Sequence, residues 1–403
     1  MKKVLIVTYH FPPDGGAAVQ RVLKFVKYLL KFGYLPFVLT AKYAYKNPDI
    51  TLLDEIPLNI QIFKTEDWGM KIPFEIRKIF KKYFSPDKQS LWKYTSIKKG
   101  IDIVQKENID LIFSTSPPHS VHLVAKEISQ STKVPWIADF RDEWTMNSLF
   151  YKTKFQDYQH ELENSVLLNC SAITTITHKA KSNFKIKCDE SKIHVIKNGF
   201  DPEDFKDISS SKIRENKIVI SYCGRLNKLH SPKPFFRMLK TLKSNGDIHS
   251  SFLSVNIIGS IENKKWLKNF QELDDIVQFI PYQTHKKCIE MMSQSSVLLL
   301  LATEMNITEF IPAKMFEYFY LKKAIYSIVS FPGELSNTLQ QYGNSYIGYE
   351  SDPDSIETSF NKLLYEGKNN NLEKPVSNEF MEQFNREILT KQLAEVFNFI
   401  NEN

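Results

Sequence analysis

The chain has 403 residues, 42% hydrophobic and 25% charged, which is the composition of a soluble globular protein with room for two domains. It carries 53 Lys and Arg against 46 Asp and Glu, a formal net charge of +7. This modest excess favours anionic ligands or an anionic membrane surface and argues against nucleic-acid binding. The four cysteines form no C-x-x-C pair and stand at no metal-ligand spacing with histidines, so we expect free thiols in a reducing compartment and no metal site.

The apolar run at the N-terminus indicates a first strand rather than an export signal. Val4 to Val7 follow two lysines, but the run stops at Thr8, which is too short for the apolar core of a signal peptide. No apolar run approaches the ~20 residues of a transmembrane helix. We therefore expect a cytoplasmic protein.

The first half of the chain alternates apolar strands with helical patterns, which favours a doubly wound parallel sheet. The predicted strands are 3–8, 36–40, 110–114, 136–139 and 172–177, and the predicted helices are 17–32 and 156–169. A second series begins near residue 217. Its predicted strands are 218–222, 253–258, 277–279 and 297–301, and its predicted helices are 234–244, 264–271 and 286–293.

The two series predict two α/β domains, 1–205 and 206–378. The segment 379–403 is expected to form a C-terminal helix that packs back toward the first domain. Two such domains face each other across a cleft, and open sheets bind ligands outside the carboxyl ends of their strands. Motifs that follow strands are therefore the candidates for function.

Three of these motifs belong to the first half. After the first strand, Gly15 and Gly16 permit a tight turn and close approach to a ligand, although an ordinary glycine turn is as good an interpretation. His119 follows the strand 110–114, where either a structural or a cleft role fits. Asp139 ends a further strand and stays undecided between an ion pair and sugar hydroxyls, while Arg141 is interpreted as part of an ion-pair network with its neighbouring carboxylates.

The second half carries a basic loop and a pair of carboxylates. Gly224, Arg225 and Lys228 follow the strand 218–222, and this arrangement favours a diphosphate clamp over a solvated loop. Glu309 and Glu317 flank a proline that can begin a helix after the strand 297–301. Alone, this last segment favours a loop followed by a helix with a salt bridge, but its context favours a corner for a nucleotide or phosphorylated ligand.

The segment from Pro73 to Phe84 has apolar residues at helical spacing and four basic residues on the other side. Two interpretations stand equal. One is a helix packed on the domain, and the other is peripheral contact with an anionic membrane, on the inner face of the cell membrane, or with a lipid-linked acceptor.

Together these motifs resemble the GT-B glycosyltransferases of family 4, and most closely the bacterial polysaccharide and cell-envelope members. The resemblance covers nearly the whole chain. It rests on Tyr9-His-Phe-Pro-Pro-Asp-Gly-Gly, Val19-Gln-Arg-Val-Leu-Lys-Phe, Ser114-Thr-Ser-Pro-Pro-His, Pro135-Trp-Ile-Ala-Asp-Phe-Arg-Asp, Asn198-Gly-Phe-Asp, Gly224-Arg-Leu and the two glutamates. It implies two Rossmann-like domains, 1–205 on the acceptor side and 206–378 for the nucleotide sugar, and a retaining, metal-independent transferase. The implied co-substrate is a nucleoside-diphosphate sugar, with no other cofactor, and the implied acceptor is a saccharide or lipid-linked saccharide in cell-surface polysaccharide synthesis.

The resemblance also implies donor-side roles. Glu317 matches the glutamate that holds the ribose, and Arg225 matches the arginine that binds the diphosphate. Lys228 and Lys314 are further phosphate candidates, and Gly15 with Gly16 matches the loop that closes toward the phosphates.

The remaining implied roles concern the transferred sugar and the acceptor. Glu309 and His119 match groups near the transferred sugar. Asn198 matches the start of the linker, and Asp139 is assigned to the acceptor side.

Two departures from the family pattern stand out. His230 occupies the position where the family often has a second phosphate-binding Lys, and bulky residues replace the usual small ones between the glutamates. The alternatives are a sugar-nucleotide epimerase of the same fold, a glycoside hydrolase using paired carboxylates, and a non-catalytic glycan-binding or scaffold relative. The Gly-Arg-Leu segment argues against the hydrolase, which needs no diphosphate clamp.

Overall fold

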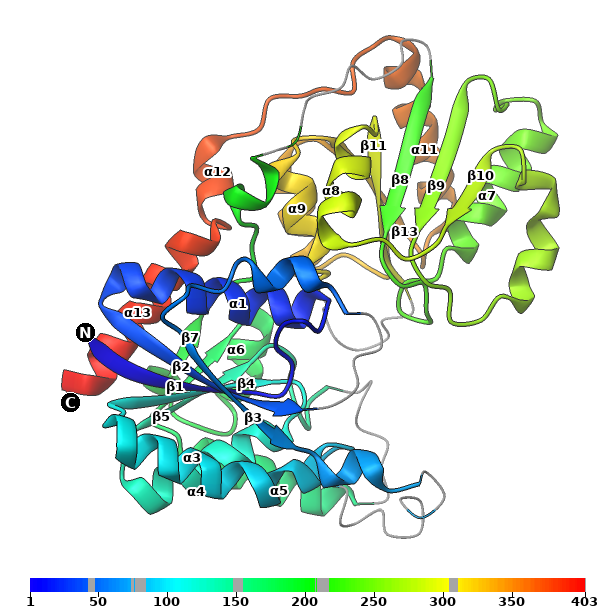
Figure 1. Cartoon of the computed structure of the whole chain (residues 1–403). Coiled ribbons are helices and arrows are strands. Elements are labelled where there is room, and N and C mark those ends of the chain that lie inside the picture. Colours follow the sequence, from blue (N-terminus) through cyan, green and yellow to red (C-terminus); the bar gives the residue numbers. More distant parts are fainter. Residues whose placement is uncertain are drawn as a thin grey trace. The chain divides into compact units, whose positions relative to one another are not determined.

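The computed structural model describes residues 1–42, 48–73, 76, 85–147, 155–206, 208, 217–303 and 311–402. The chain forms two compact units (Figure 1). Unit 1 comprises Met1–Asn198 with Arg386–Asn403, and unit 2 comprises Gly199–Asn385. The chain passes from unit 1 to unit 2 after Asn198, whereas the predicted domains meet after residue 205. Each unit is described by itself.

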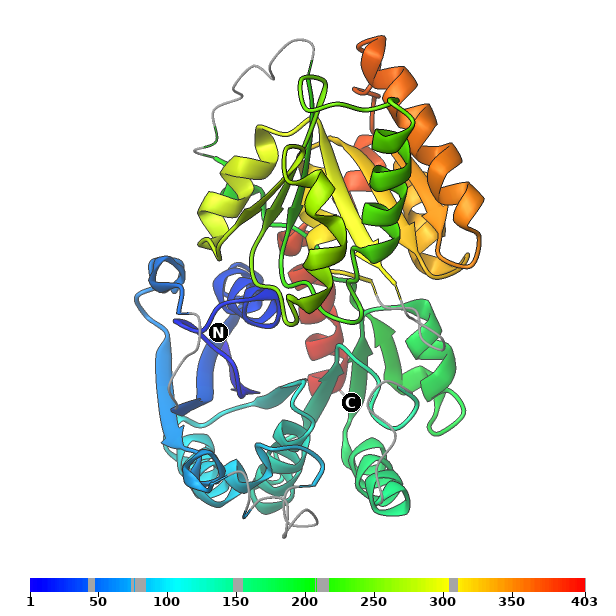
Figure 2. The same cartoon turned by 90° about the vertical axis from the view of Figure 1, so that its right-hand side faces the viewer.

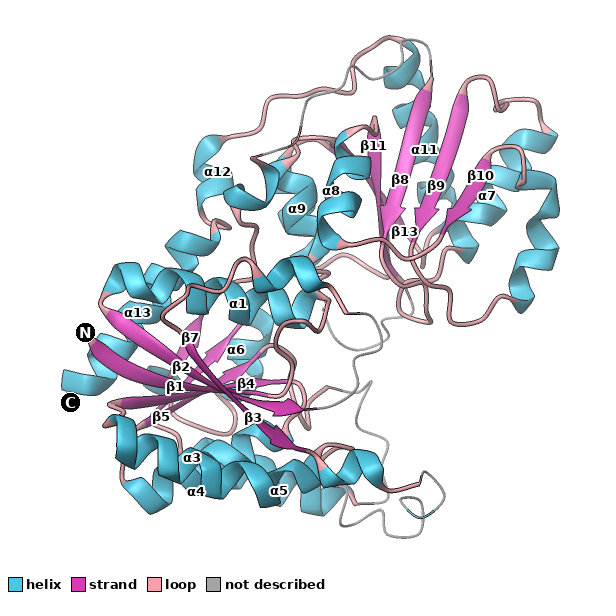
Figure 3. Cartoon of the chain, in the orientation of Figure 1, coloured by secondary structure: helices cyan, strands magenta, loops and turns pink. Residues whose placement is uncertain are grey.

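Unit 1 holds a seven-stranded parallel sheet in the order β3-β2-β1-β4-β5-β6-β7 (Figure 3). The strands are β1 (Lys2–Thr8), β2 (Tyr34–Lys42), β3 (Gln61–Glu66), β4 (Leu111–Ser116), β5 (Trp136–Phe140), β6 (Ala172–Thr175) and β7 (Ile193–Val195). The α-helices are α1 (Ala17–Leu29), α3 (Lys93–Glu107), α4 (Ser120–Thr132), α5 (Gln156–Asn169), α6 (His178–Phe184) and α13 (Arg386–Glu402). Short 3₁₀ helices are η1 (Leu30–Phe32), η2 (Ile50–Leu53), η3 (Trp68–Lys71), η5 (Ser90–Trp92) and η6 (Glu190–Lys192).

Both faces of the unit 1 sheet are covered, which explains why its central strands are apolar runs rather than alternating patterns. Val4 and Ile6 face a cluster completed by Leu393 and Phe397 of α13, while Leu5 and Val7 face the cluster that includes α3 and α4. The helix α13 lies beside α1 in Figure 1. The C-terminal segment therefore completes one face of the first sheet.

Unit 2 holds a six-stranded parallel sheet in the order β10-β9-β8-β11-β12-β13. The strands are β8 (Ile218–Cys223), β9 (Leu253–Ile258), β10 (Val277–Ile280), β11 (Val297–Ala302), β12 (Ala324–Val329) and β13 (Ser345–Tyr349). The α-helices are α7 (Lys233–Ser244), α8 (His285–Ser293), α9 (Lys314–Tyr320), α10 (Glu334–Tyr342), α11 (Pro353–Lys368) and α12 (Asn378–Glu382), with the 3₁₀ helices η7 (Pro202–Phe205) and η8 (Lys265–Leu273). Helices α7 and α11 cover one face of the sheet, and α8 lies on the other (Figure 2).

In each sheet the chain order reverses at one place, between β1 and β4 in unit 1 and between β8 and β11 in unit 2. Ligands of doubly wound sheets bind at such switch points, outside the carboxyl ends of the strands. The segments that leave these four strands carry Gly15 and Gly16, His119, Arg225, and the stretch that leads to Glu317. The fold thus brings the predicted motifs to the switch points of their own sheets.

The expected fold class, two doubly wound parallel-sheet domains, is confirmed. The predicted helix 17–32 is α1 followed by η1, and the single predicted C-terminal helix is divided into α12 and α13. The strands β3, β7, β12 and β13 were not predicted. The predicted basic helix from Pro73 to Phe84 lies, apart from Pro73 and Ile76, outside the described residues. Within the described part of the chain, no helix combines the length and the apolar character needed to cross a membrane.

Candidate functional site

Two glycines allow close backbone packing at the switch point of unit 2. Gly224 follows β8 with φ 142°, and its N–H donates to the carbonyl of Ile258 at 2.8 Å. A Cβ on Gly259 (φ 130°) would lie 2.2 Å from the carbonyl oxygen of Gly224, and a Cβ on Gly224 would lie 2.6 Å from Nζ of Lys314. At Gly259 a backbone contact and a φ that L residues avoid both require glycine, whereas at Gly224 the requirement comes from the backbone angle, because the flexible end of Lys314 can move.

The ammonium group of Lys314 lies beside this glycine turn. Its Nζ lies 3.8 Å from the centroid of the Tyr222 ring. Although the side chain is partly exposed, the surrounding protein desolvates the ammonium group and lowers the pKa of Lys314 to about 8. An ammonium group in this position gains from an anionic partner that restores what burial has removed.

Glu317 lies one helical turn after Lys314 on α9, and its partner is a histidine. Oε1 of Glu317 is 2.8 Å from Nε2 of His285, the first residue of α8. Thr284 caps α8 by accepting from the backbone N–H of Lys287, which fixes the helix end that carries His285. About a fifth of each side chain is exposed, so the pair is accessible to a ligand. The interpretation of Lys314 and Glu317 as a salt bridge is wrong, because Glu317 pairs with His285.

Arg225 and Lys228 occupy the loop after Gly224. The Nη2 atom of Arg225 lies 3.2 Å from Oε1 of Glu262, and both side chains are more than half exposed. Such a surface pair contributes about 0–1 kcal/mol, so the guanidinium is free to exchange Glu262 for a better anion. Lys228 is exposed and lines a shallow cavity of about 320 Å³ with Asn227 and Trp266.

His230 occupies the position where the family often has a second phosphate-binding lysine. In this chain its side chain and backbone hold the loop after β8 in place. Its Nδ1 lies 2.8 Å from the carbonyl of Leu301 on β11, and its backbone N–H donates to Oδ1 of Asn227 at 3.1 Å. Burial, followed by the charge of Lys314, lowers the pKa of His230 to about 4. The ring is therefore neutral at pH 7 and offers no charge to a phosphate. Glu309 lies outside the described residues.

In unit 1, the predicted glycine turn begins α1. Gly16 stands at the N-cap of the helix with φ 108°, and its carbonyl accepts from Val19 at 3.0 Å and Gln20 at 3.2 Å. A Cβ there would meet nothing within 4 Å, so the requirement for glycine comes from the backbone angle alone. Gly15 precedes it and is partly exposed.

His119 ends the loop after β4 and stands at the N-cap of α4. Its ring stacks on Trp144 with centroids 4.9 Å apart and planes inclined by 3°. Burial lowers the pKa of His119 to about 3, so the imidazole is neutral. The two rings line a cavity of about 350 Å³ together with Asp87 and Asp142.

Asp139 and Asn198 are joined through one arginine. The guanidinium of Arg21 donates to Oδ1 of Asp139 at 2.9 Å and to Oδ2 at 3.2 Å, and also to Oδ1 of Asn198 at 3.2 Å. Thr115 and Thr174 each donate to Asp139 at 2.7 Å. Burial raises the pKa of the Asp139 carboxyl, but Arg21 and these hydrogen bonds outweigh it and leave the pKa below its usual value.

This network makes Asp139 a positioning residue. Through Arg21 it holds residues 196–198, where the first segment of unit 1 ends. Its side chain is fully buried and its oxygens are occupied, while Arg21 also binds the carbonyls of Ile196 and Lys197 at 2.9 and 2.8 Å. The prediction that Arg141 forms ion pairs with its neighbouring carboxylates is wrong in its partners, because the hydrogen-bond partners of Arg141 are backbone carbonyls. Its guanidinium donates to the carbonyls of Ser116 (2.7 Å) and Pro117 (3.0 Å), which fixes the loop before His119.

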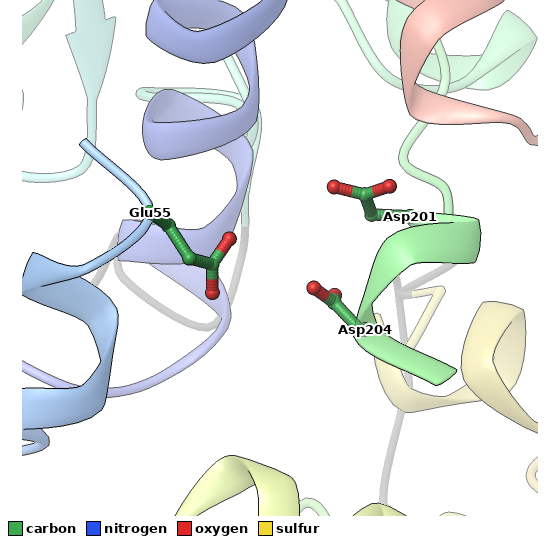
Figure 4. A group of neighbouring side chains, drawn as sticks. All are labelled: Glu55, Asp201 and Asp204. Atoms are coloured by element: carbon green, nitrogen blue, oxygen red, sulfur yellow. The ribbon is translucent and has the colours of Figure 1, made fainter. Parts of the chain in front are cut away.

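Figure 4 draws three carboxylates that serve their own units. Asp201 caps η7 by accepting from the N–H of Glu203 at 3.0 Å, and Asp204 lies on the same short helix in unit 2. Glu55 belongs to unit 1, where it pairs with Nζ of the buried Lys24 at 2.5 Å. Helix capping accounts for Asp201 and ion pairing for Glu55.

Comparison with known proteins agrees with this arrangement. The family model "Glycosyltransferase Family 4" matches residues 15–204, and the model "Glycosyl transferases group 1" matches residues 203–378. The chain belongs to the group 1 glycosyltransferases of family 4. The two matches together span both switch points, so this glycosyltransferase carries the family pattern in each unit. A search of curated proteins found no match.

Solved structures share the fold of this glycosyltransferase. HepE of Anabaena, in complex with UDP, superposes with a TM-score of 0.69 at 13% identity, over 99% of this chain and 100% of that one. Sucrose-phosphate synthase of Thermosynechococcus elongatus gives a TM-score of 0.74 at 13% identity, over 99% and 98% of the two chains. A glycosyltransferase of Rickettsia africae gives 0.69 at 15% identity, over 100% and 99%. These likenesses establish the GT-B fold.

Sequence reasoning missed three groups of the candidate sites. His285 carried a usable signal, because it begins a helix on the chain segment that leaves the strand β10. Asp87 and Trp144 carried none. They reach the cavity beside His119 from the loop before η5 and from the segment after β5.

Proposed function

We propose that the protein is a retaining, metal-independent glycosyltransferase. Its donor is a nucleoside-diphosphate sugar, and its acceptor is a saccharide or lipid-linked saccharide in cell-surface polysaccharide synthesis. The observation that carries the proposal is the group at the switch point of unit 2. Lys314 beside Gly224 and the loosely held Arg225 offer positive charge for the diphosphate. The carboxylate of Glu317, paired with His285, offers a hydrogen-bond acceptor for the ribose.

The diphosphate is the part of the donor that Lys314 and Arg225 suit. A desolvated ammonium group regains favourable electrostatics from a phosphate oxygen, and a planar guanidinium can bind two oxygens at once. Cleavage of the bond between the anomeric carbon and the phosphate increases the negative charge on the leaving diphosphate. Fixed positive side chains stabilise that charge, which is the task a metal ion performs in other transferases.

The ribose suits the carboxylate of Glu317. A carboxylate accepts hydrogen bonds from two neighbouring hydroxyls, and His285 holds Oε1 of Glu317 in place before the ligand arrives. We also propose that Lys228, Gly15 and Gly16 contact the nucleotide-sugar donor. Glu309 is proposed near the transferred sugar on the strength of the family pattern alone.

His119 is proposed to contact the transferred sugar. With a pKa of about 3 its imidazole is neutral, so it offers hydrogen bonds to hydroxyls and does not act as a general acid at pH 7. Retention of the anomeric configuration then depends on the acceptor attacking from the face on which the diphosphate leaves, with a phosphate oxygen taking the acceptor proton.

A thermal-shift screen tests the proposal. The full chain is heated in EDTA with UDP, GDP, ADP or CMP, and the unfolding temperature is recorded. A nucleotide at 100 times its dissociation constant stabilises the fold by about 2.7 kcal/mol, a visible shift. We expect one nucleoside diphosphate to stabilise the chain without metal. No shift with any of the four, or a shift only after Mg²⁺ is added, contradicts the proposal.

A further inference from the structure

Two cysteine thiols lie against each other beside the glycine turn of unit 2. Cys223 is the last residue of β8 and directly precedes Gly224, while Cys288 closes the first turn of α8, which His285 begins. The thiol of Cys223 donates to the sulfur of Cys288, and Cys288 in turn donates to the carbonyl of Gln283 at 3.8 Å. The two sulfurs meet only because the fold packs α8 against β8.

The surroundings of the pair are electropositive and within reach of solvent. The ammonium group of Lys314 interacts electrostatically with both thiols, and its charge favours the thiolate form of Cys223. Part of each cysteine is accessible to solvent, so a small reagent can reach it. Reactive cysteines occur in partly exposed, electropositive surroundings of this kind, whereas structural cysteines are buried among apolar groups.

The two thiols differ in which one keeps its proton. The hydrogen bond to Cys288, followed by burial, raises the pKa of the Cys223 thiol, so Cys223 stays protonated. Cys288 lies in the first turn of α8, where the partial positive charge of the helix end favours a thiolate. Cys288 is therefore the sulfur that attacks first, and Cys223 is the sulfur that completes the bond.

We propose that Cys223 and Cys288 form a reversible disulfide that weakens nucleotide binding at unit 2, an inference that rests on the proposed function only for its effect on nucleotide binding. The oxidant is a small-molecule disulfide. The thiolate of Cys288 attacks one sulfur of this reagent, which forms a mixed disulfide and releases one small thiol. The thiol of Cys223 then loses its proton and attacks the sulfur of Cys288, which releases the second small thiol. Two protein thiols are oxidised and one small disulfide is reduced to two thiols.

The new bond disturbs the donor corner through its length. An S–S bond of about 2.05 Å is shorter than any contact between unbonded sulfurs, so its formation draws the end of β8 and the first turn of α8 together. His285 lies on that turn, and its hydrogen bond to Glu317 is 2.8 Å long. Because a hydrogen bond weakens when its partners move out of line, oxidation loosens the carboxylate proposed to hold the ribose. It also shifts Gly224, which lies beside Lys314.

Peptide mapping by mass spectrometry tests the chemistry. The full chain is incubated with glutathione disulfide, the remaining thiols are alkylated, and linked peptides are identified. We expect a link between Cys223 and Cys288 that dithiothreitol reverses, both in the wild type and in C188S. Cys188 is a partly exposed thiol of unit 1 and is the matched control. If Cys223 and Cys288 stay reduced, or carry only separate glutathione adducts, in the folded wild type, the inference is overturned.

Calorimetric titration with the stabilising nucleoside diphosphate tests the consequence. We expect the oxidised wild type and oxidised C188S to bind it at least fivefold more weakly than the reduced proteins, with full recovery after reduction. In the double variant C223S/C288S, treatment with glutathione disulfide should leave the affinity unchanged. Equal affinity of the oxidised and reduced wild type, with the link present, overturns the inference.

The inference and the proposed function fail separately. If the link forms but the reduced chain binds no nucleotide, the dithiol stands as a modification site and the donor site is wrong. If a nucleotide stabilises the reduced chain but no link forms, the disulfide is wrong and the proposed function stands.

Discussion

Nε2 of His285 lies 2.8 Å from Oε1 of Glu317, which joins the first turns of α8 and α9 beside the switch point of the second sheet. The pair holds a carboxylate in one orientation before any ligand is bound. Pre-organisation of this kind favours recognition, because the ligand does not bear the entropic cost of fixing the side chain. The histidine is thus a positioning residue for Glu317.

Replacement of His285 should reduce the discrimination between ribose and deoxyribose. We expect H285A to weaken the nucleotide about 3–10-fold, and E317A to weaken it about 10–100-fold because a hydrogen bond to a charged group is lost. The measurement is calorimetric titration with the ribonucleotide and its 2′-deoxy analogue. A preference for the ribonucleotide that is unchanged in E317A would exclude the ribose contact.

The affinity for the diphosphate should fall as the pH rises above 8. The pKa of Lys314 is lowered to about 8, so the free protein loses the ammonium charge above that pH, and a bound phosphate raises the pKa again. Each further pH unit should weaken binding by up to about tenfold until the pKa of the bound state is reached. Titrations from pH 6.5 to 9.5 check this, and K314M should flatten the profile. A wild-type profile that is flat above pH 8 would contradict the role of Lys314.

Gly259 should tolerate no side chain. In G259A the new methyl group would lie 2.2 Å from the carbonyl oxygen of Gly224, at a φ of 130° that L residues avoid. We expect a loss of about 2–4 kcal/mol in unfolding free energy, together with weaker nucleotide binding because the turn at Gly224 shifts. Gly246 has φ 81° with nothing within 4 Å of its Cβ. G246A is the control for backbone strain alone, and equal losses in the two variants would exclude the steric account.

Asp139 should matter for stability rather than for ligand contact. D139N leaves Arg21 buried without its counter-charge, which costs about 3–5 kcal/mol. The pKa of Asp139 is lowered in the fold, so its contribution is present above the pKa of the unfolded chain and is lost as the pH falls through the folded value. Urea unfolding between pH 7 and pH 3 measures both effects. If D139N were as stable as the wild type but did not bind an acceptor, the stability role would be excluded and Asp139 would be assigned to the acceptor site.

Much of the fold follows from the sequence because the central strands are fully buried. Val297 to Ala302 and Val4 to Val7 have no exposed face, so their apolar runs are unmistakable. The strand β3 was missed because its residues are half-exposed at the sheet edge and mix charge with apolar side chains. The division into α12 and α13 was missed because Gln383–Asn385 carries no glycine or proline to mark the break.

The sequence could place a candidate residue only where its position after a strand determines where it lies in the fold. Arg225 and His119 follow β8 and β4 directly, and the parallel order of the sheets fixes where they emerge. What the sequence could not supply is pairing across elements. The contact of Glu317 with His285, the neutral state of His230 and the saturation of Asp139 by Arg21 depend on tertiary packing, which no local pattern encodes.

The central claim is that the switch point of unit 2 binds a nucleoside diphosphate through Lys314 without a metal ion. Calorimetric titration of the stabilising nucleotide in EDTA, with wild-type protein, K314M and K287M, tests it most directly. Lys287 is an exposed lysine of α8 that pairs with Glu290 at 2.9 Å, so K287M removes the same charge from a side chain that has its own partner. The account predicts metal-free binding that K314M weakens about 10–100-fold and K287M leaves unchanged. Equal affinity in K314M and K287M, or binding that requires a divalent metal, would contradict it.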